Sequence, residues 1–225
     1  MMTVTFPRLT GLLMLLGAVL AGCSNSGQKN PLQITAGQIA QRLGKGTEPV
    51  DARNVLTPAI VAQSTGSILL AVQLKVDAAF TLRPKAANRG TVQWEAANGS
   101  ALLQRNGILV GTRGFGFDLM TADIEPLAAA LVAGGGRDLL RVHRILAGGE
   151  MVVTNYFCDL TAQGSETLTY YGRAFPTRAY RESCRSEAGE TFENLYWVSP
   201  NGTVRRSVER VSPEIGRFDL VRLTE

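Results

Sequence analysis

Two Asn-Gly pairs, Asn98-Gly99 and Asn106-Gly107, constrain the fold of this chain more than any other feature of its sequence. Each pair separates short apolar runs, and asparagine and glycine both tolerate the positive φ angles that tight hairpin turns require. The two turns follow one another directly, so they join three consecutive strands. Residues 91–112 are therefore predicted to form a three-stranded antiparallel meander.

The strand pattern continues to the end of the chain, with Gly, Pro and Asn between the apolar runs. Further strands are predicted at 67–76, 139–147, 151–162, 166–181, 191–199, 203–211 and 217–223. Residues 55–62 are a weaker strand candidate because Pro58 interrupts them. The sequence therefore predicts a mainly β fold: an antiparallel meander forming a curved sheet or a partly closed barrel, with one or two packed helices.

The clearest helix is predicted at Thr121–Val132. Thr121 or Asp123 would cap its N-terminus, and the glycines at 134–136 would end it. A weaker helical spacing of apolar residues covers Leu32–Leu43.

The N-terminal segment ends in Leu20-Ala21-Gly22-Cys23, which has the shape of a lipobox. Arg8 precedes an apolar run that is too short for a transmembrane helix. The sequence therefore predicts a lipoprotein signal peptide at 1–22, a lipidated tether at 23–31, and a single β-rich periplasmic domain at 32–225. The thiol of Cys23 would carry diacylglycerol, and acylation of its amino group would complete a stable anchor.

An ordinary secretory signal with an incidental cysteine is the alternative. Ser24 follows the cysteine, at the position where an aspartate acts as an inner-membrane retention signal in lipoproteins generally. We therefore expect a protein anchored by lipid in the outer membrane and facing the periplasm.

The charge balance excludes one class of partner. The chain has 23 Lys and Arg against 19 Asp and Glu, a net charge of +4. The basic residues are scattered, and only Arg205 and Arg206 are adjacent, so no basic stripe suits a nucleic-acid backbone. A modest attraction to anionic head groups or to an acidic polysaccharide stays open beside the simpler interpretation of a solvated surface.

Beyond Cys23, the chain has two cysteines, Cys158 and Cys184. In an oxidising compartment an even pair favours a disulfide. It would close a loop of about 25 residues and contribute roughly 3 kcal/mol. Two buried free thiols are the alternative. One histidine and two cysteines at unrelated spacing predict no metal site.

The most unusual local sequence is the segment Thr112–Asp118, TRGFGFD. Glycines at alternate positions indicate a bulge or a close backbone approach, and Arg113 and Asp118 are placed to pair across the bend. One interpretation is a binding loop in which Arg113 donates to an anion or hydroxyl while Phe115 or Phe117 stacks on a sugar. The other is a structural bend with both rings in the core.

The residues predict no catalytic group. His143, the only histidine, lies on a predicted strand with Arg141 on the same side, and we expect it to be half-exposed. No Gly-x-Ser-x-Gly motif supplies a nucleophilic serine for it. Tyr196 and Trp197 face opposite ways on another predicted strand, so one of them is expected to be exposed.

Two segments resemble the YjbF/GfcB-type lipoproteins, which are linked to export of exopolysaccharide and group 4 capsule. They are Ala101–Met120 (ALLQRNGILVGTRGFGFDLM) and Cys184–Arg206 (CRSEAGETFENLYWVSPNGTVRR). The first contains a strand-turn-strand unit that ends in the pattern NG-x-L-v-x-T-R-G, and the second contains an E-x-G…Y-W-V hairpin followed by G-x-V-R. The resemblance spans most of residues 60–223.

The resemblance implies a non-enzymatic accessory or assembly component of polysaccharide export, without a cofactor. Its expected partners are an outer-membrane β-barrel export protein and a co-encoded periplasmic protein; direct contact with the polysaccharide stays open. The family offers no established catalytic residues to carry over.

Two other functions remain as alternatives. A lipid or lipoprotein carrier would need an apolar cavity larger than about 300 Å³ beneath the helix at 121–132. A polysaccharide-modifying enzyme would need clustered carboxylates with raised pKa values in a cleft.

Overall fold

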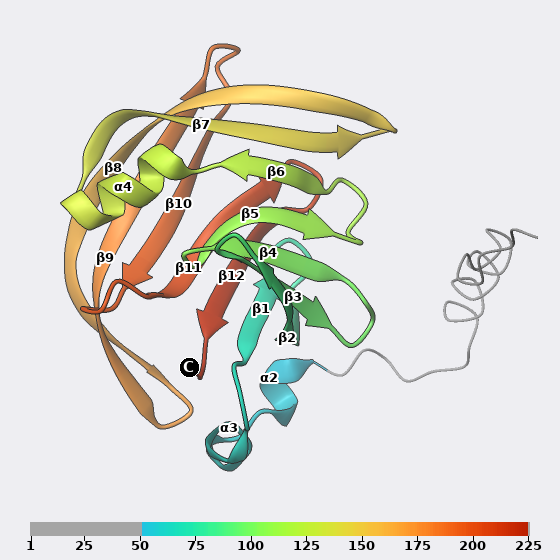
Figure 1. The fold of residues 1–225 in the computed structure, drawn as a ribbon, viewed down its shortest axis with the longest axis vertical. Helices are drawn as coiled ribbons and strands as arrows, with labels where there is room; N and C mark the ends of the chain where they lie inside the picture. The colour runs from blue at the N-terminus through green and yellow to red at the C-terminus, as the bar shows by residue number, and fades with distance from the viewer. Residues whose placement is uncertain (1–50, 225) are drawn as a thin grey trace, which may run out of the picture. The chain divides into compact units, whose positions relative to one another are not determined.

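The computed structural model describes residues 51–224. Within them, twelve antiparallel strands form one sheet that curls until it is nearly closed into a barrel (Figure 1). The predicted fold class is thus confirmed. Cys23, the segments 1–22 and 23–31, and the helix expected at Leu32–Leu43 lie outside the described residues.

The strands are β1 (Leu69–Gln73), β2 (Ala78–Asn88), β3 (Thr91–Ala96), β4 (Ala101–Arg105), β5 (Ile108–Arg113), β6 (Leu119–Asp123), β7 (Gly136–Ala147), β8 (Glu150–Tyr170), β9 (Arg173–Ser186), β10 (Thr191–Val198), β11 (Val204–Ser212) and β12 (Gly216–Arg222). The helices are α2 (Ala52–Val55), α3 (Pro58–Gln63) and α4 (Glu125–Ala133). None of these three helices has the length and apolar character needed to cross a membrane.

The sheet order is β5-β4-β3-β2-β1-β12-β11-β10-β9-β8-β7-β6. Each ladder but one joins strands that follow one another in the sequence. The exception is β1–β12, which pairs Leu69 with Arg222 and Gln73 with Phe218. The two edges of the sheet, β5 and β6, are consecutive strands, and they meet where the barrel nearly closes.

Both predicted Asn-Gly turns are present, joining β3 to β4 and β4 to β5. In the second turn Asn106 and Gly107 both have positive φ, 52° and 78°. In the first turn only Gly99 does, and the Asn98 side chain accepts a hydrogen bond from the Ser100 amide at 3.0 Å.

Gly107 also allows a close approach between two hairpins. A Cβ atom there would lie 2.7 Å from the Cβ of Val204, on a backbone that side chains rarely adopt. We expect Gly107→Ala to lower the free energy of unfolding by about 2–4 kcal/mol, since strain and overpacking add. The matched control is Gly99→Ala, which has a similar φ of 83° but no neighbour within 4 Å. Urea unfolding should show a loss of only about 1 kcal/mol for it, and equal losses would refute the packing argument.

The strand expected over residues 55–62 is wrong, because this segment forms α2 and α3. The Thr57 hydroxyl caps α3 by accepting a hydrogen bond from the Ile60 amide, and Pro58 occupies the first turn. Proline is favourable at that position, since its missing N–H would have no partner there. Pro58, which made the strand prediction weaker, therefore lies at the start of a helix.

The helix expected over Thr121–Val132 begins too early. Residues 119–123 form β6, which pairs with β7, and the helix starts at Glu125. Ile124 occupies the N-cap position and makes no side-chain hydrogen bond, but the Asp123 carboxylate accepts one from the Glu125 amide at 3.4 Å. Gly134 ends the helix in the left-handed conformation, as predicted.

Two further strand assignments differ from the prediction. The strand expected over residues 166–181 is divided by a turn at Tyr171 and Gly172, which have φ of 49° and 78°. Strand β2 had no predicted counterpart, because beyond Leu82 its side chains are exposed on both faces and show no apolar alternation.

The barrel interior is filled by one apolar core that includes Leu82, Leu102, Leu109, Phe218 and Leu220. Two smaller clusters cover the outer face, one beneath α2 and α3 and the other around Trp197. Tyr196 and Trp197 do face opposite ways, but the expectation that one is exposed is wrong. Tyr196 lies in the interior, and Trp197 is buried in the outer cluster.

Candidate functional site

A charged cluster lies inside the barrel. Arg141 of β7 is 1 % exposed, and its Nη1 donates to Glu182 Oε2 of β9 at 3.1 Å. Its Nη2 lies 3.4 Å from Glu209 Oε2 of β11. The Tyr196 hydroxyl of β10 is within 3.0 Å of Glu182 and 3.1 Å of Glu209. Four strands thus converge on one guanidinium.

The two carboxylates have further partners that hold them in place. Glu182 accepts from Asn194 Nδ2 at 2.7 Å, and Glu209 accepts from the Leu109 amide of β5 at 3.0 Å. Burial raises the pKa of Glu209, and the charge of Arg141 opposes that shift. Burial also raises the pKa of Tyr196, with the two glutamates adding to the shift. The cluster ties the strands together and holds its charges away from solvent.

His143 belongs to this buried cluster, so the expectation that it is half-exposed is wrong. It is 1 % exposed, and its Nε2 accepts a hydrogen bond from Arg141 Nε at 2.9 Å. Burial and the nearby charges of Arg141 and Arg210 lower its pKa, so the ring is neutral. Its ring packs against Tyr156 and Phe192. The histidine therefore acts as an acceptor for a buried cation.

The predicted disulfide is confirmed. Cys158 and Cys184 are directly opposite each other on β8 and β9, with Cα atoms 4.0 Å apart, and their sulfurs are bonded. A Glu182 carboxylate oxygen lies near both sulfurs, within a group 4.8 Å across. Because the sulfurs are bonded to each other, they are not thiolates and offer no metal ligands here.

The segment Thr112–Asp118 fastens the two edges of the sheet. Arg113 on β5 donates to the carbonyl oxygens of Leu119 and Met120 on β6, each at 3.2 Å. The Thr112 hydroxyl accepts from the Leu119 amide at 3.0 Å. These side-chain bonds join β5 to β6 at the place where the barrel would otherwise be open.

Asp118 organises the bend itself and does not pair with Arg113 as expected. Its carboxylate accepts from the Thr112 hydroxyl at 2.7 Å and from the Gly114 amide at 2.9 Å. The Phe115 ring packs 5.1 Å from that of Phe218 in the core, whereas Phe117 is 38 % exposed. Three of the four residues proposed for binding therefore have structural contacts, and a binding role for this loop stays a prediction.

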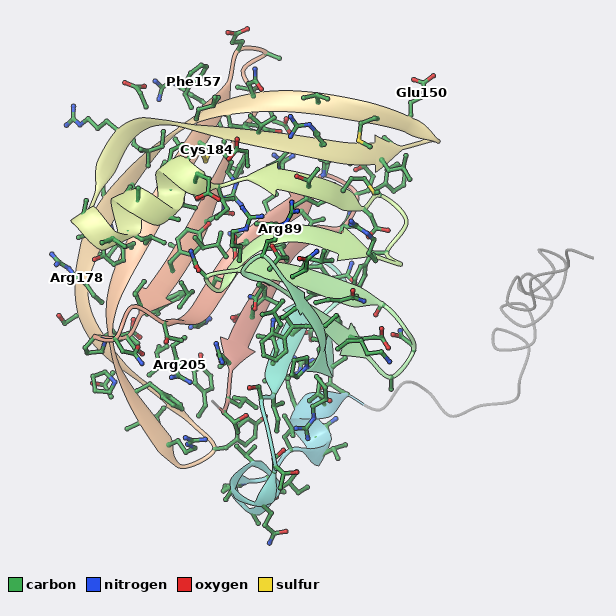
Figure 2. All side chains as sticks on the ribbon, viewed as in Figure 1. Arg89, Glu150, Phe157, Arg178, Cys184 and Arg205 are labelled. Carbon is green, nitrogen blue, oxygen red and sulfur yellow. A yellow bond between two sulfur atoms is a disulfide. The ribbon has the colours of Figure 1, made fainter. Side chains whose placement is uncertain are left out.

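Three cavities adjoin one another, with volumes of about 450, 560 and 420 Å³, and the first two are lined in part by α4. The first and second share Leu131, Val132, Val198 and Gly202 as walls. The second and third share Ser165, Glu166 and Tyr180. Figure 2 shows Arg205 and Arg178, which line the first and second cavities, on the side of the barrel away from Glu150 at the tip of the β7–β8 hairpin.

The first cavity has a mixed lining. Leu131 of α4 and Trp94 of β3 give apolar walls, while Gln104 of β4, Asn201 of the β10–β11 turn and Arg222 of β12 are polar. Its lining, within the described part of the chain, includes two arginines and no carboxylate. The cavity thus combines an aromatic wall, hydrogen-bonding groups and positive charge.

Sequence reasoning missed both the interior cluster and this cavity. For the cavity a signal was available, because Phe218 and Leu220 point into the core and alternation puts Arg222 on the same side of β12. An arginine that ends an apolar stripe indicates a cation at the rim of the interior. For the cluster, Arg141 and His143 were correctly assigned to one side of a strand, but their burial and their glutamate partners depend on barrel curvature.

Comparison with known proteins places these features in a family context. Residues 26–223 match the profile of a family described as group 4 capsule polysaccharide lipoprotein GfcB, YjbF. The fold is similar to the crystal structure of the hypothetical lipoprotein YmcC from Escherichia coli K12, with a TM-score of 0.68 and 16 % sequence identity. That alignment covers 88 % of this chain and 98 % of YmcC. No curated protein sequence matches at a significant level.

Proposed function

This chain belongs to the YjbF family of group 4 capsule polysaccharide lipoproteins, and from that premise we propose that it is a non-enzymatic accessory component of exopolysaccharide or capsule export. We propose further that Cys23 anchors it in the outer membrane, facing the periplasm. The observation that carries the proposal is the extent of the family match, which begins just after Cys23 and includes the whole barrel.

The interior of the barrel supports a role without catalysis. The groups best suited to acid–base chemistry, His143, Glu182 and Glu209, are each at most 1 % exposed and are bonded to Arg141 or to neighbouring strands. A polysaccharide chain would meet only the outer surface and the cavities beside α4. The protein would then act by binding and docking, with an outer-membrane β-barrel export protein and a co-encoded periplasmic protein as its partners.

A lipid or lipoprotein carrier function is the second candidate. The first cavity is larger than the minimum volume expected for a carrier, and it is bounded by α4. Its lining is less suitable, since the guanidinium of Arg222 would lose water without gaining a partner around an acyl chain. We therefore favour the accessory function.

The anchor gives a direct test. We expect Cys23→Ser to abolish labelling by an alkyne analogue of palmitate and to remove the processed protein from the outer membrane, because the thiol is the attachment atom. Ser24→Asp is the matched control, and it should keep the label while moving the protein to the inner membrane. Labelling that persists in Cys23→Ser would contradict the assignment.

Partner binding needs a separate experiment. The lipidated protein is crosslinked in its own membranes, purified in detergent and analysed by mass spectrometry. An outer-membrane β-barrel protein among the specific products is the expected result. Recovery of this protein with phospholipid alone would instead favour the carrier.

A further inference from the structure

Resting on the proposed function, we propose that the first cavity beside α4 binds an acidic saccharide, with Arg222 contacting its anionic group and Trp94 forming the wall against the sugar ring. The chemistry recognised is a carboxylate or phosphate carried on a sugar. The site lies apart from the charged cluster inside the barrel and from the segment Thr112–Asp118.

Within the described residues, Arg222 is a cation without a counter-ion. Its side chain is partly buried, and among residues 51–224 its guanidinium makes no hydrogen bond or ion pair. The guanidinium makes a cation–π contact with the Trp94 ring, at 5.9 Å from the ring centre. Its Nε is buried without a partner. Arg206 on β11 shows the usual alternative, since it makes two hydrogen bonds to Asp219. Leaving a guanidinium unpaired in a cavity is unfavourable unless an anion enters.

Trp94 carries a second unmet donor. It is 3 % exposed, and its Nε1 is buried with no hydrogen-bond partner in the described part of the chain. Trp197, by contrast, donates from Nε1 to Glu166 Oε2 at 2.6 Å. Buried indole N–H groups usually have an acceptor. The part of the indole ring that lines the cavity supplies an apolar face of the kind that pyranose C–H groups need.

The charge of the lining selects an acidic ligand. Among residues 51–224, no aspartate or glutamate lines the first cavity, so none of them competes there with a ligand anion for Arg222. The exposed Arg89 adjoins Gly90, which is also part of the lining. A neutral sugar or a lipid chain would leave Arg222 without an anionic partner.

The adjoining cavities indicate a ligand longer than one sugar. Each of the three volumes lies within the range of about 300–1,000 Å³ that is typical of small-ligand sites. Tyr180 and Trp197 line the third cavity, and Arg178 lines the second. An oligosaccharide that enters beside Trp94 would therefore meet Arg178 in the second cavity and Tyr180 and Trp197 in the third. The wall between these two cavities also contains Glu166, whose carboxylate accepts a hydrogen bond from Trp197 Nε1.

The test uses the lipidated protein in detergent and oligogalacturonate of three to six residues, because each of its sugars carries one carboxylate. We expect saturable binding by calorimetry that weakens as salt is raised, and no binding of malto-oligosaccharides of the same length. Arg222→Gln should weaken binding at least tenfold, and Arg222→Lys should restore part of the loss.

Arg217→Gln is the matched control. It removes the same charge from an exposed position near the other end of β12, and it should change affinity less than twofold. Trp94→Phe should weaken binding in the same calorimetric assay, because it reduces the indole wall of the first cavity. Thermal unfolding of each variant verifies that it is folded. The comparison of acidic with neutral sugar uses the unmodified protein alone, so it does not depend on the folding of a variant.

Several outcomes would overturn the proposal. Two of them are equal binding of neutral and acidic sugars, and equal affinity of the Arg222 and Arg217 variants for the acidic sugar. The third is binding of phosphatidylglycerol vesicles through Arg222 without binding of the sugar. That result would assign the site to a lipid headgroup. Absence of sugar binding together with retained co-purification of the outer-membrane partner would refute this inference alone. Sugar binding without that partner would refute the assembly function and leave the site intact.

Discussion

Replacing Arg141 by methionine is expected to lower the free energy of unfolding by about 3–5 kcal/mol at pH 8. The change removes the cation from a cluster in which Glu182 and Glu209 are both fully buried. It also leaves His143 Nε2 without its donor. Urea unfolding followed by circular dichroism measures the loss. A loss below 1 kcal/mol would show that the carboxylates do not depend on the guanidinium.

The pH dependence of that loss follows from two pKa shifts. Burial already raises the pKa of Glu209, and without Arg141 it should rise further, so the folded variant takes up a proton more readily than the unfolded chain. Burial and the charges of Arg141 and Arg210 lower the pKa of His143, so losing Arg141 makes its protonation easier. Both effects stabilise the variant relative to the wild type as pH falls. The difference in free energy of unfolding should therefore be largest at pH 8 and shrink towards pH 5.

Two further variants distinguish the contribution of buried charge to the free energy of unfolding from that of packing. Combining Arg141→Met with Glu182→Gln and Glu209→Gln should recover part of the loss, because no buried charge is then left unpaired. Arg217→Met removes an exposed arginine and should stay within about 0.5 kcal/mol of the wild type. A triple variant less stable than Arg141→Met would mean that the glutamates act through geometry and not through charge.

The double replacement Cys158→Ala with Cys184→Ala is expected to cost about 3–4 kcal/mol. The bond closes a loop with a sequence separation of 26 residues, and the chain-entropy model gives a value of this size for such a loop. Both residues are buried, so the lost sulfur contacts add to the cost. The measurement is the urea midpoint of the oxidised wild type against that of the double variant.

A reducing agent provides the control for this prediction. It should move the midpoint of the wild type towards that of the double variant and leave the double variant unchanged. A wild-type midpoint that is insensitive to reduction, with both thiols reactive after unfolding without a reductant, would mean that the bond is absent in solution.

Local turn chemistry explains why much of the sheet was predictable. The Asn-Gly turns, the glycines at 148–149 and the Pro-Asn-Gly turn at 200–202 fix their hairpins through the φ preferences of a few residues. The turn at Tyr171 was missed because a tyrosine with positive φ gives no such signal. The helix start was misplaced because pairing of β6 with β7 outweighed the capping preference of Thr121 and Asp123.

The sites depend on distances that alternation cannot supply. Alternation placed Arg141 and His143 on one side of a strand, yet only the curvature of the sheet brings Glu182 and Glu209 to them from β9 and β11. The Arg113 segment was singled out correctly as unusual. Its structural contacts arise because the two edges of the sheet meet there, which is a property of the whole barrel.

The position of β12 has a consequence for how the molecule forms. The last strand of the chain lies in the middle of the sheet, between β1 and β11, and its Phe218 and Leu220 are at most 1 % exposed. A nascent chain that lacks these residues has two separate groups of strands and an incomplete core. Their joining is the one pairing step with a large sequence separation, which carries the greatest entropic cost and slows folding. The sheet therefore cannot be completed before residues 216–222 have been synthesised.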